Sequence, residues 1–233
     1  MTEQRMTSGE RDRRGFLREA AAVAAAVGAG ALLSGSAHAA QAPHRVGQGL
    51  ADPLPPVGVD IPCSMYSANV PLKLNILGAL TLDFKGGINL GVRTAGEDGL
   101  VLEVQGFRME ADTSPSTPNS GILIALTMSN ATITPLSVLR KKTGGGLEML
   151  LYLSLTTEVI DKATGETLLM LATDPTKYAT LWASDVKAFP PVNQPYTLRE
   201  PVQLFEMQGD TVQTDKPAGV LEGFDGIING SGA

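Results

Sequence analysis

Apolar and polar residues alternate in short runs along most of the chain after residue 70. A period of two is typical of β-strands with one buried face. Glycine, proline and acidic residues separate the runs, and we find no long run with a helical apolar period. The pattern favours an all-β fold of about six to nine strands, either an antiparallel β-sandwich or a β-barrel. The expected strands cover residues 72–76, 80–84, 88–92, 100–109, 122–133, 147–155, 167–172 and 202–207.

Irregularities in the alternation predict bulges and turns. Gly86-Gly87 allows a bend or a bulge, and a shift of the apolar phase after Gly106 predicts another bulge. The segment 161–166 is typical of a hairpin turn. We therefore expect the runs 147–156 and 167–172 to pair as antiparallel strands.

Composition divides the chain into four parts. Residues 1–39 form a separate leader, described below. Residues 40–69 are rich in proline, glycine and small residues, which is typical of an extended linker or a strap on a domain. Residues 70–215 hold the strand pattern and are expected to form one all-β domain, and residues 216–233 are expected to be a glycine-rich C-terminal tail.

Two of the expected strands, 122–126 and 147–155, are apolar on both faces. Antiparallel strands usually leave one face in water, so both faces of these strands need cover. A central strand under the linker, packing against another subunit, or an apolar pocket would each supply it. A pocket would suit a lipid, a sterol or a polyketide-like molecule. From the alternation, its candidate lining is Leu126, Met128, Met149, Leu151 and Leu153.

The composition argues against several kinds of chemistry. The chain has one cysteine, Cys63, and one histidine after residue 39, His44, so a catalytic triad, a catalytic thiolate and a histidine metal site all lack support. We expect Cys63 to be buried and inert. We expect no metal and no cofactor, since no nucleotide-binding loop is present either. Four carboxylates in the strands are expected on solvated faces: Glu103, Glu110, Glu148 and Glu158.

The net charge limits the partners. The first 39 residues hold five basic and four acidic side chains, which leaves 13 basic and 20 acidic side chains in the rest of the chain. An acidic protein of this kind lacks the basic surface that nucleic acids and anionic membranes require.

The first 39 residues have the organisation of an export signal. A polar region with several arginines precedes 18 uncharged residues, 20–37, and the segment Ala37-His38-Ala39 fits the small-x-small site of a signal peptidase. Arg13, Arg14, Phe16 and Leu17 resemble the twin-arginine consensus, with Asp12 in the position of its usual serine or threonine. The resemblance implies the twin-arginine export machinery and signal peptidase as partners, and a secreted, periplasmic or envelope location. An uncleaved anchor and ordinary Sec export are the alternatives. We expect no stable membrane span after cleavage, because the apolar stretch is short and rich in alanine and glycine.

Taken together, these features indicate an exported all-β protein that binds another molecule or acts as an accessory module, with an apolar small molecule as its expected ligand. One alternative is a cofactor-free enzyme of the barrel isomerase or cyclase type. Another is an oligomeric envelope or surface protein, and the oligomeric state stays open.

Overall fold

A computed structural model describes residues 54–113, 119–129 and 135–230. These residues form thirteen strands and no helix. The predicted export-signal residues Arg13, Arg14, Phe16, Leu17, Ala37 and Ala39 lie outside the described residues. The strands, in chain order, are β1 (Asp60–Leu74), β2 (Gly78–Gly96), β3 (Gly99–Asp112), β4 (Ile122–Met128), β5 (Ser137–Lys141), β6 (Leu147–Leu153), β7 (Leu155–Asp161), β8 (Thr167–Thr173), β9 (Ala179–Val186), β10 (Gln194–Leu198), β11 (Val202–Gln208), β12 (Thr211–Leu221) and β13 (Asp225–Gly230).

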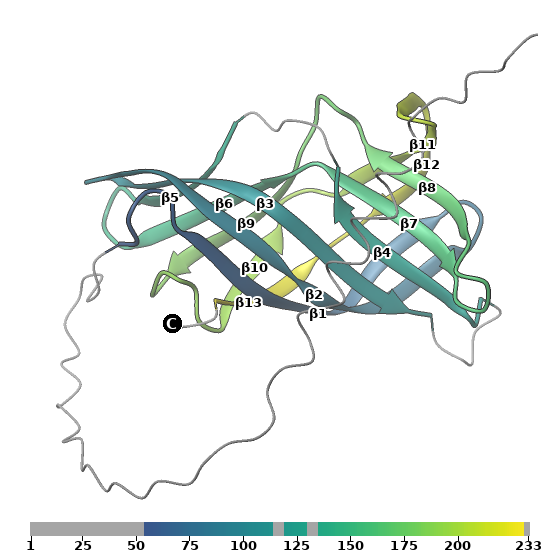
Figure 1. Cartoon of the computed structure of the whole chain (residues 1–233), viewed down its shortest axis with the longest axis horizontal. Helices are drawn as coiled ribbons and strands as arrows, with labels where there is room; N and C mark the ends of the chain where they lie inside the picture. The colour runs from purple at the N-terminus through teal and green to yellow at the C-terminus, as the bar shows by residue number, and fades with distance from the viewer. Residues whose placement is uncertain (1–53, 114–118, 130–134, 231–233) are drawn as a thin grey trace, which may run out of the picture. The chain divides into compact units, whose positions relative to one another are not determined.

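All thirteen strands belong to one antiparallel sheet, which closes into a barrel (Figure 1). Three positions of the barrel wall are the long, uninterrupted strands β1, β2 and β3. Each of the other five positions holds two shorter strands end to end: β4 with β5, β7 with β6, β8 with β9, β11 with β10, and β12 with β13. Both β12 and β13 pair with β1, so the last position closes on the first. The protein is therefore an up-and-down barrel of eight strand positions, which confirms the predicted all-β antiparallel fold.

The five interrupted positions place their breaks side by side around one half of the barrel. Backbone groups at the breaks find partners outside the strand ladder, as buried peptide groups must. The amide of Leu155 donates to Thr173 Oγ1 at 3.2 Å. The amide of Arg199 donates to the Thr180 carbonyl at 3.0 Å, and the amide of Glu222 donates to the Pro71 carbonyl at 3.0 Å. The barrel wall thus has a continuous half and a segmented half.

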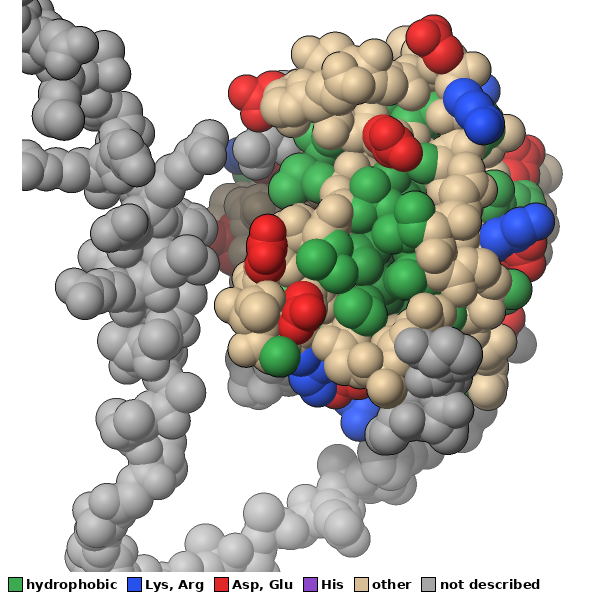
Figure 2. Space-filling model, turned by 90° about the vertical axis from the view of Figure 1, so that its right-hand side faces the viewer, with side chains coloured by type: hydrophobic (Ala, Val, Ile, Leu, Met, Phe, Trp, Pro, Cys, Tyr) green, Lys and Arg blue, Asp and Glu red, His purple; other side chains and the backbone are tan. Residues whose placement is uncertain are grey.

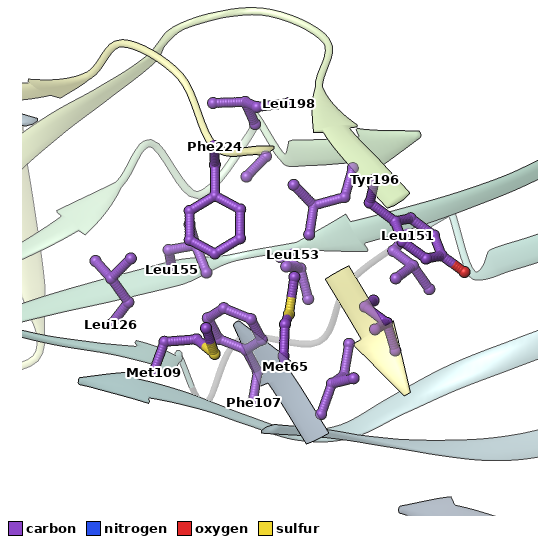
Figure 3. Packing of buried hydrophobic residues seen from close by; sticks show 14 of the residues in the cluster. Met65, Phe107, Met109, Leu126, Leu151, Leu153, Leu155, Tyr196, Leu198 and Phe224 are labelled. Carbon is purple, nitrogen blue, oxygen red and sulfur yellow. The ribbon is translucent and has the colours of Figure 1, made fainter. Parts of the chain in front are cut away.

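The interior is filled by apolar side chains from every position of the wall. Leucine dominates this core, and the residues labelled in Figure 3 meet around the barrel axis. At one end of the barrel, apolar side chains gather at the centre and polar or charged atoms surround them (Figure 2). Leu80 and Leu169 are partly buried and pack against this core. They pair across the sheet with the buried residues Leu72 and Val159, so they face inward.

The domain extends beyond the predicted limits at both ends. Strand β1 begins at Asp60, within the expected linker 40–69, and β12 and β13 occupy most of the expected tail 216–233. The boundaries 70–215 were therefore too narrow. Proline and glycine in these segments obscured the alternation of Ile61, Cys63 and Met65, all of which are buried. Pairing with β2 on one side and β13 on the other holds this segment in the wall.

Some of the predicted turns, bulges and strand pairings are present in the structure, and others are not. The hairpin turn at 161–166 is confirmed, because β7 and β8 pair antiparallel on either side of it, and so is the bulge at Gly106, where the register with β2 shifts. The expected pairing of the run 147–156 with 167–172 is wrong for most of the run. Only Thr156 pairs with β8, whereas residues 147–153 form β6, which pairs with β5 and β9. The run 147–155 is divided at Ser154 into β6 and β7, because Ser154 Oγ forms hydrogen bonds with Ser129 Oγ at 2.7 Å and Thr173 Oγ1 at 3.3 Å. Strand β4 ends at Met128, and residues 130–133 lie outside the described residues. At Gly86-Gly87 the register is unbroken, so the predicted bulge is wrong there.

Candidate functional site

A small void lies inside the segmented half of the barrel. Its volume is about 10 Å3, close to the space that a single water requires. Figure 3 shows aromatic and aliphatic side chains converging from opposite sides of the interior. Most of the lining residues flank a break in the wall. The lining is Phe107, Leu126, Leu153, Leu155, Ala179, Leu181, Leu198, Leu221 and Phe224.

An open groove lies against the same breaks. It has a volume of about 670 Å3 and follows the gap between β8–β9 and β10–β11. Strand β10 pairs with β9 at Leu198 and Leu181, and β11 pairs with β8 at Leu204 and Thr173. Between these two pairings, the chain forms no ladder pairs with β8 or β9. The groove is lined by Thr173, Asp174, Lys177, Tyr178, Thr180, Arg199, Glu200, Pro201, Val202, Gln203, Phe205 and Val220.

Only a thin layer of side chains separates the groove from the interior. Val202 lines the groove, yet it pairs directly with Leu221, which lines the void. Directly paired residues point to the same face of a sheet, so Val202 belongs to the inward face. Thr173 also lines the groove and pairs with Leu204, which is fully buried in the core. At this gap, inward-facing residues are thus reached from outside the barrel.

Polar and aromatic side chains surround the groove. The guanidinium of Arg199 lies 5.6 Å from the centre of the Trp182 ring, a cation–π distance. The Trp182 indole donates to Glu148 at 3.1 Å. Hydrogen bonds from Arg140 and Trp182 lower the pKa of Glu148. These contacts hold Trp182 in place on the outer face of β9.

Asp174 is committed to the turn that forms one wall of the groove. Its carboxylate accepts hydrogen bonds from the Thr176 amide at 2.8 Å and the Thr176 hydroxyl at 2.7 Å. These bonds lower the pKa of Asp174. The ring of Tyr178, in the same turn, contacts Tyr152 edge to face, with centroids 6.3 Å apart. The turn is therefore ordered by its own side chains.

The described interior contains no charged group. Its buried polar residues are serine, threonine and glutamine, and its ionisable groups are Cys63 and Tyr196. Burial raises the pKa of the Cys63 thiol to about 11. Burial, and to a smaller extent Cys63, also raises the pKa of Tyr196, whose hydroxyl donates to Met149 Sδ at 2.9 Å. Both groups are neutral at physiological pH, so the interior suits an uncharged molecule.

The five predicted pocket residues lie in different places. Leu126 and Leu153 line the void. Met149 and Leu151 are fully buried in the interior, and Met128 is partly buried against it. Sequence reasoning missed Phe107 and Phe224, the aromatic part of the lining. Phe107 follows the Gly106 bulge, which displaces it from the regular phase, and Phe224 lies in the segment interpreted as a tail.

The four strand carboxylates lie on the outer face, none of them buried. Three pair with arginines: Glu103 with Arg93, Glu110 with Arg108, and Glu148 with Arg140. Within the described ranges, no group of three or more His, Cys, Asp or Glu side chains is arranged to hold a metal ion. The described residues also contain no helix with the length and apolar character needed to cross a membrane.

Comparison with known proteins yields a likeness in structure. No family model matches the chain, and no curated protein matches its sequence. The fold resembles that of DynF, a protein from the dynemicin biosynthesis pathway of Micromonospora chersina. The TM-score is 0.53, the sequence identity is 14%, and the match covers 81% of this chain and 90% of DynF. At this identity the likeness shows a shared fold alone.

Proposed function

We propose that the protein binds an apolar small molecule, which reaches the barrel interior through the gap between β8–β9 and β10–β11. The observation that carries the proposal is the position of Val202. Its side chain lines the outer groove and pairs with Leu221, which lines the void. A molecule in the groove therefore needs to displace few side chains to reach the interior.

The groove and the void differ in size, so we assign them different roles in binding. The groove, at about 670 Å3, is in the range of small-molecule sites, roughly 300–1,000 Å3. The void of about 10 Å3 holds no such molecule unless side chains move. The interior contains Met65, Met109 and Met149, whose flexible side chains adapt to new shapes. The ligand would rest in the groove and insert an apolar part as Val202 and these methionines shift.

The chemistry of the walls supports a lipid, a sterol or a polyketide-like molecule. The void is lined only by apolar residues, and the described interior is uncharged. The fold of a protein from a biosynthesis pathway, DynF, is compatible with a role in handling a small molecule. We also propose that the protein acts after export by the twin-arginine route, as its first 39 residues indicate.

Each of two alternative functions has one specific observation in its favour. An isomerase or cyclase would need acid–base groups, and the carboxylates nearest the gap are Asp174 and Glu200 in the groove. A structural oligomer would need an apolar outer surface, and Tyr66 and Ile227, both more than 40% exposed, pair directly on β1 and β13. Native mass spectrometry of the full chain separates these hypotheses, because it detects a bound molecule and an oligomer in the same measurement.

The binding test uses Trp182, the single tryptophan of the chain, which stands beside the groove. Palmitate, cholesterol and the polycyclic quinone emodin represent the three ligand classes. Binding of at least one of them should change the tryptophan fluorescence. We expect Val202→Phe to weaken that binding more than about tenfold, because the larger ring closes the gap. Val192→Phe, at an exposed position, is the matched control. Equal affinity in both variants would argue against access through the gap, and no binding of any class would contradict the function.

A further inference from the structure

Among the described residues, two buried side-chain oxygens have no hydrogen-bond partner: Asn89 Oδ1, on the outer face of β2, and one atom in the interior. The interior atom is the hydroxyl oxygen of Thr157, a residue with none of its surface exposed. Several other buried hydroxyls have partners: Ser67 donates to the Asp225 carbonyl at 2.7 Å, and Thr113 donates to the Asn119 carbonyl at 2.6 Å. Thr173 accepts from the Leu155 amide. The Thr157 hydroxyl differs from these because it is buried without a hydrogen bond, which is rare in folded proteins.

The side chain of Thr157 faces the inside of the barrel. On β7 it lies between Leu155 and Val159, which are both buried in the core, at intervals of two residues. It pairs across the sheet with Leu126 on β4 and Leu171 on β8, which are core residues as well. All four neighbours are apolar, so they offer the hydroxyl nothing to bond.

Thr157 also stands beside the void and the gap. Leu126 and Leu155, its neighbours across the sheet and along the strand, line the void. Leu171, its neighbour on the other side, is two residues from Thr173, which lines the outer groove. A molecule that enters at the gap and fills the void would contact Leu126 and Leu155, the side chains that flank the Thr157 hydroxyl.

A buried hydroxyl without a partner lowers the stability of the folded state, and valine would fill the same shape without that loss. We propose that Thr157 binds an oxygen atom of the ligand, either a carbonyl or a hydroxyl. The inference rests on the proposed function and names its ligand class: a neutral, largely apolar molecule that carries an oxygen group in its buried part. A charged head group does not fit this position, because the described interior has no cation or anion to pair with it.

The test compares two threonines and two probes. The variants of the full chain are Thr157→Val and the control Thr113→Val, whose buried hydroxyl has partners in the backbone and lines neither the groove nor the void. The probes are decan-2-one, labelled with 13C at its carbonyl, and decane, which has the same chain without oxygen. NMR titration gives both dissociation constants, and the carbonyl chemical shift reports a hydrogen bond. Thermal unfolding without ligand gives the cost of the unpaired hydroxyl.

We expect Thr157→Val to weaken binding of the ketone about three- to tenfold, to leave the affinity for decane unchanged, and to move the carbonyl shift toward its value in apolar solvent. The same variant should raise the unfolding midpoint by about 2–4 °C. Thr113→Val should lower the midpoint, because it leaves the Ile122 amide without an acceptor, and should keep the preference for the ketone.

The outcomes separate this inference from the function on which it rests. If the wild type binds both probes and Thr157→Val leaves their ratio unchanged, the role of Thr157 is overturned while binding stands. A lower unfolding midpoint in Thr157→Val with an unchanged ratio would also overturn it, since a buried water would then be the partner of the hydroxyl. If the wild type binds neither probe, the inference and the proposed interior site both fail.

Discussion

The inside of the barrel is apolar, and burial there keeps two ionisable groups, Cys63 and Tyr196, in their neutral forms. The thiol of Cys63 is 5% exposed, and burial moves its pKa from an ordinary value near 9 to about 11. The sequence prediction of a buried cysteine is confirmed. Tyr196 is fully enclosed as well, with a methionine sulfur as acceptor for its hydroxyl. Thioether sulfur is a weak acceptor, so this hydrogen bond orients the ring more than it stabilises the fold.

The raised pKa of Cys63 predicts a loss of stability at high pH. The folded state favours the neutral thiol, so the contribution is complete below about pH 9 and is lost as the pH rises through 11. Urea unfolding between pH 8 and pH 11 should show a falling free energy of unfolding. In Cys63→Ala the fall should be shallower, with Tyr196 accounting for what remains. An identical pH profile in both proteins would contradict the prediction.

Individual strands depend on glycines that let neighbouring backbones approach. At Gly219 in β12, a β-carbon would lie 2.7 Å from Leu74 Cδ2 and 2.9 Å from the Lys73 carbonyl oxygen of β1. This glycine lies at the closure of the barrel, where Gly219 pairs with Leu74. Its position explains why a glycine-rich segment, expected to be a tail, forms part of the wall.

Gly219→Ala should therefore destabilise the protein by about 1–3 kcal/mol, because the added methyl group meets backbone that cannot move freely. Gly96→Ala is the control, since a β-carbon there meets nothing within 4 Å. It should change the free energy of unfolding by less than about 0.5 kcal/mol. Chemical unfolding of both variants measures the difference. A Gly219→Ala variant as stable as the control would show that β1 and β12 can separate at no cost.

At the scale of the whole molecule, closure of the barrel determines which faces are buried. Strands 122–126 and 147–155 are apolar on both faces, and their inner faces pack around the barrel axis. The segmented half brings the breaks of five wall positions together, and the groove and the void lie on either side of them. A continuous wall on this side would have separated the two spaces by a full strand ladder.

Closure also predicts that the last eighteen residues are required for folding. A chain that ends at residue 215 lacks β13 and the part of β12 that pairs with β1, so β1 would become an open edge. We expect this chain to lose cooperative thermal unfolding, as measured by circular dichroism. Removal of residues 231–233 alone should leave the transition unchanged. Cooperative unfolding of the chain that ends at 215 would instead support the tail that the sequence predicted.

The sequence by itself determined the fold class, the hairpin turn at 161–166 and the bulge at Gly106, because these depend on alternation and local turn residues. It also identified Leu126 and Leu153, which line the void, as inward-facing residues. Only the tertiary structure decided that the sheet closes, that β1 and β13 belong to it, and that Phe224 and Val202 stand at the gap. Closure and register join residues distant in the chain, and no local pattern records which strand is adjacent to which. The unpaired hydroxyl of Thr157 was hidden for the same reason, since its neighbours Leu126 and Leu171 come from other strands.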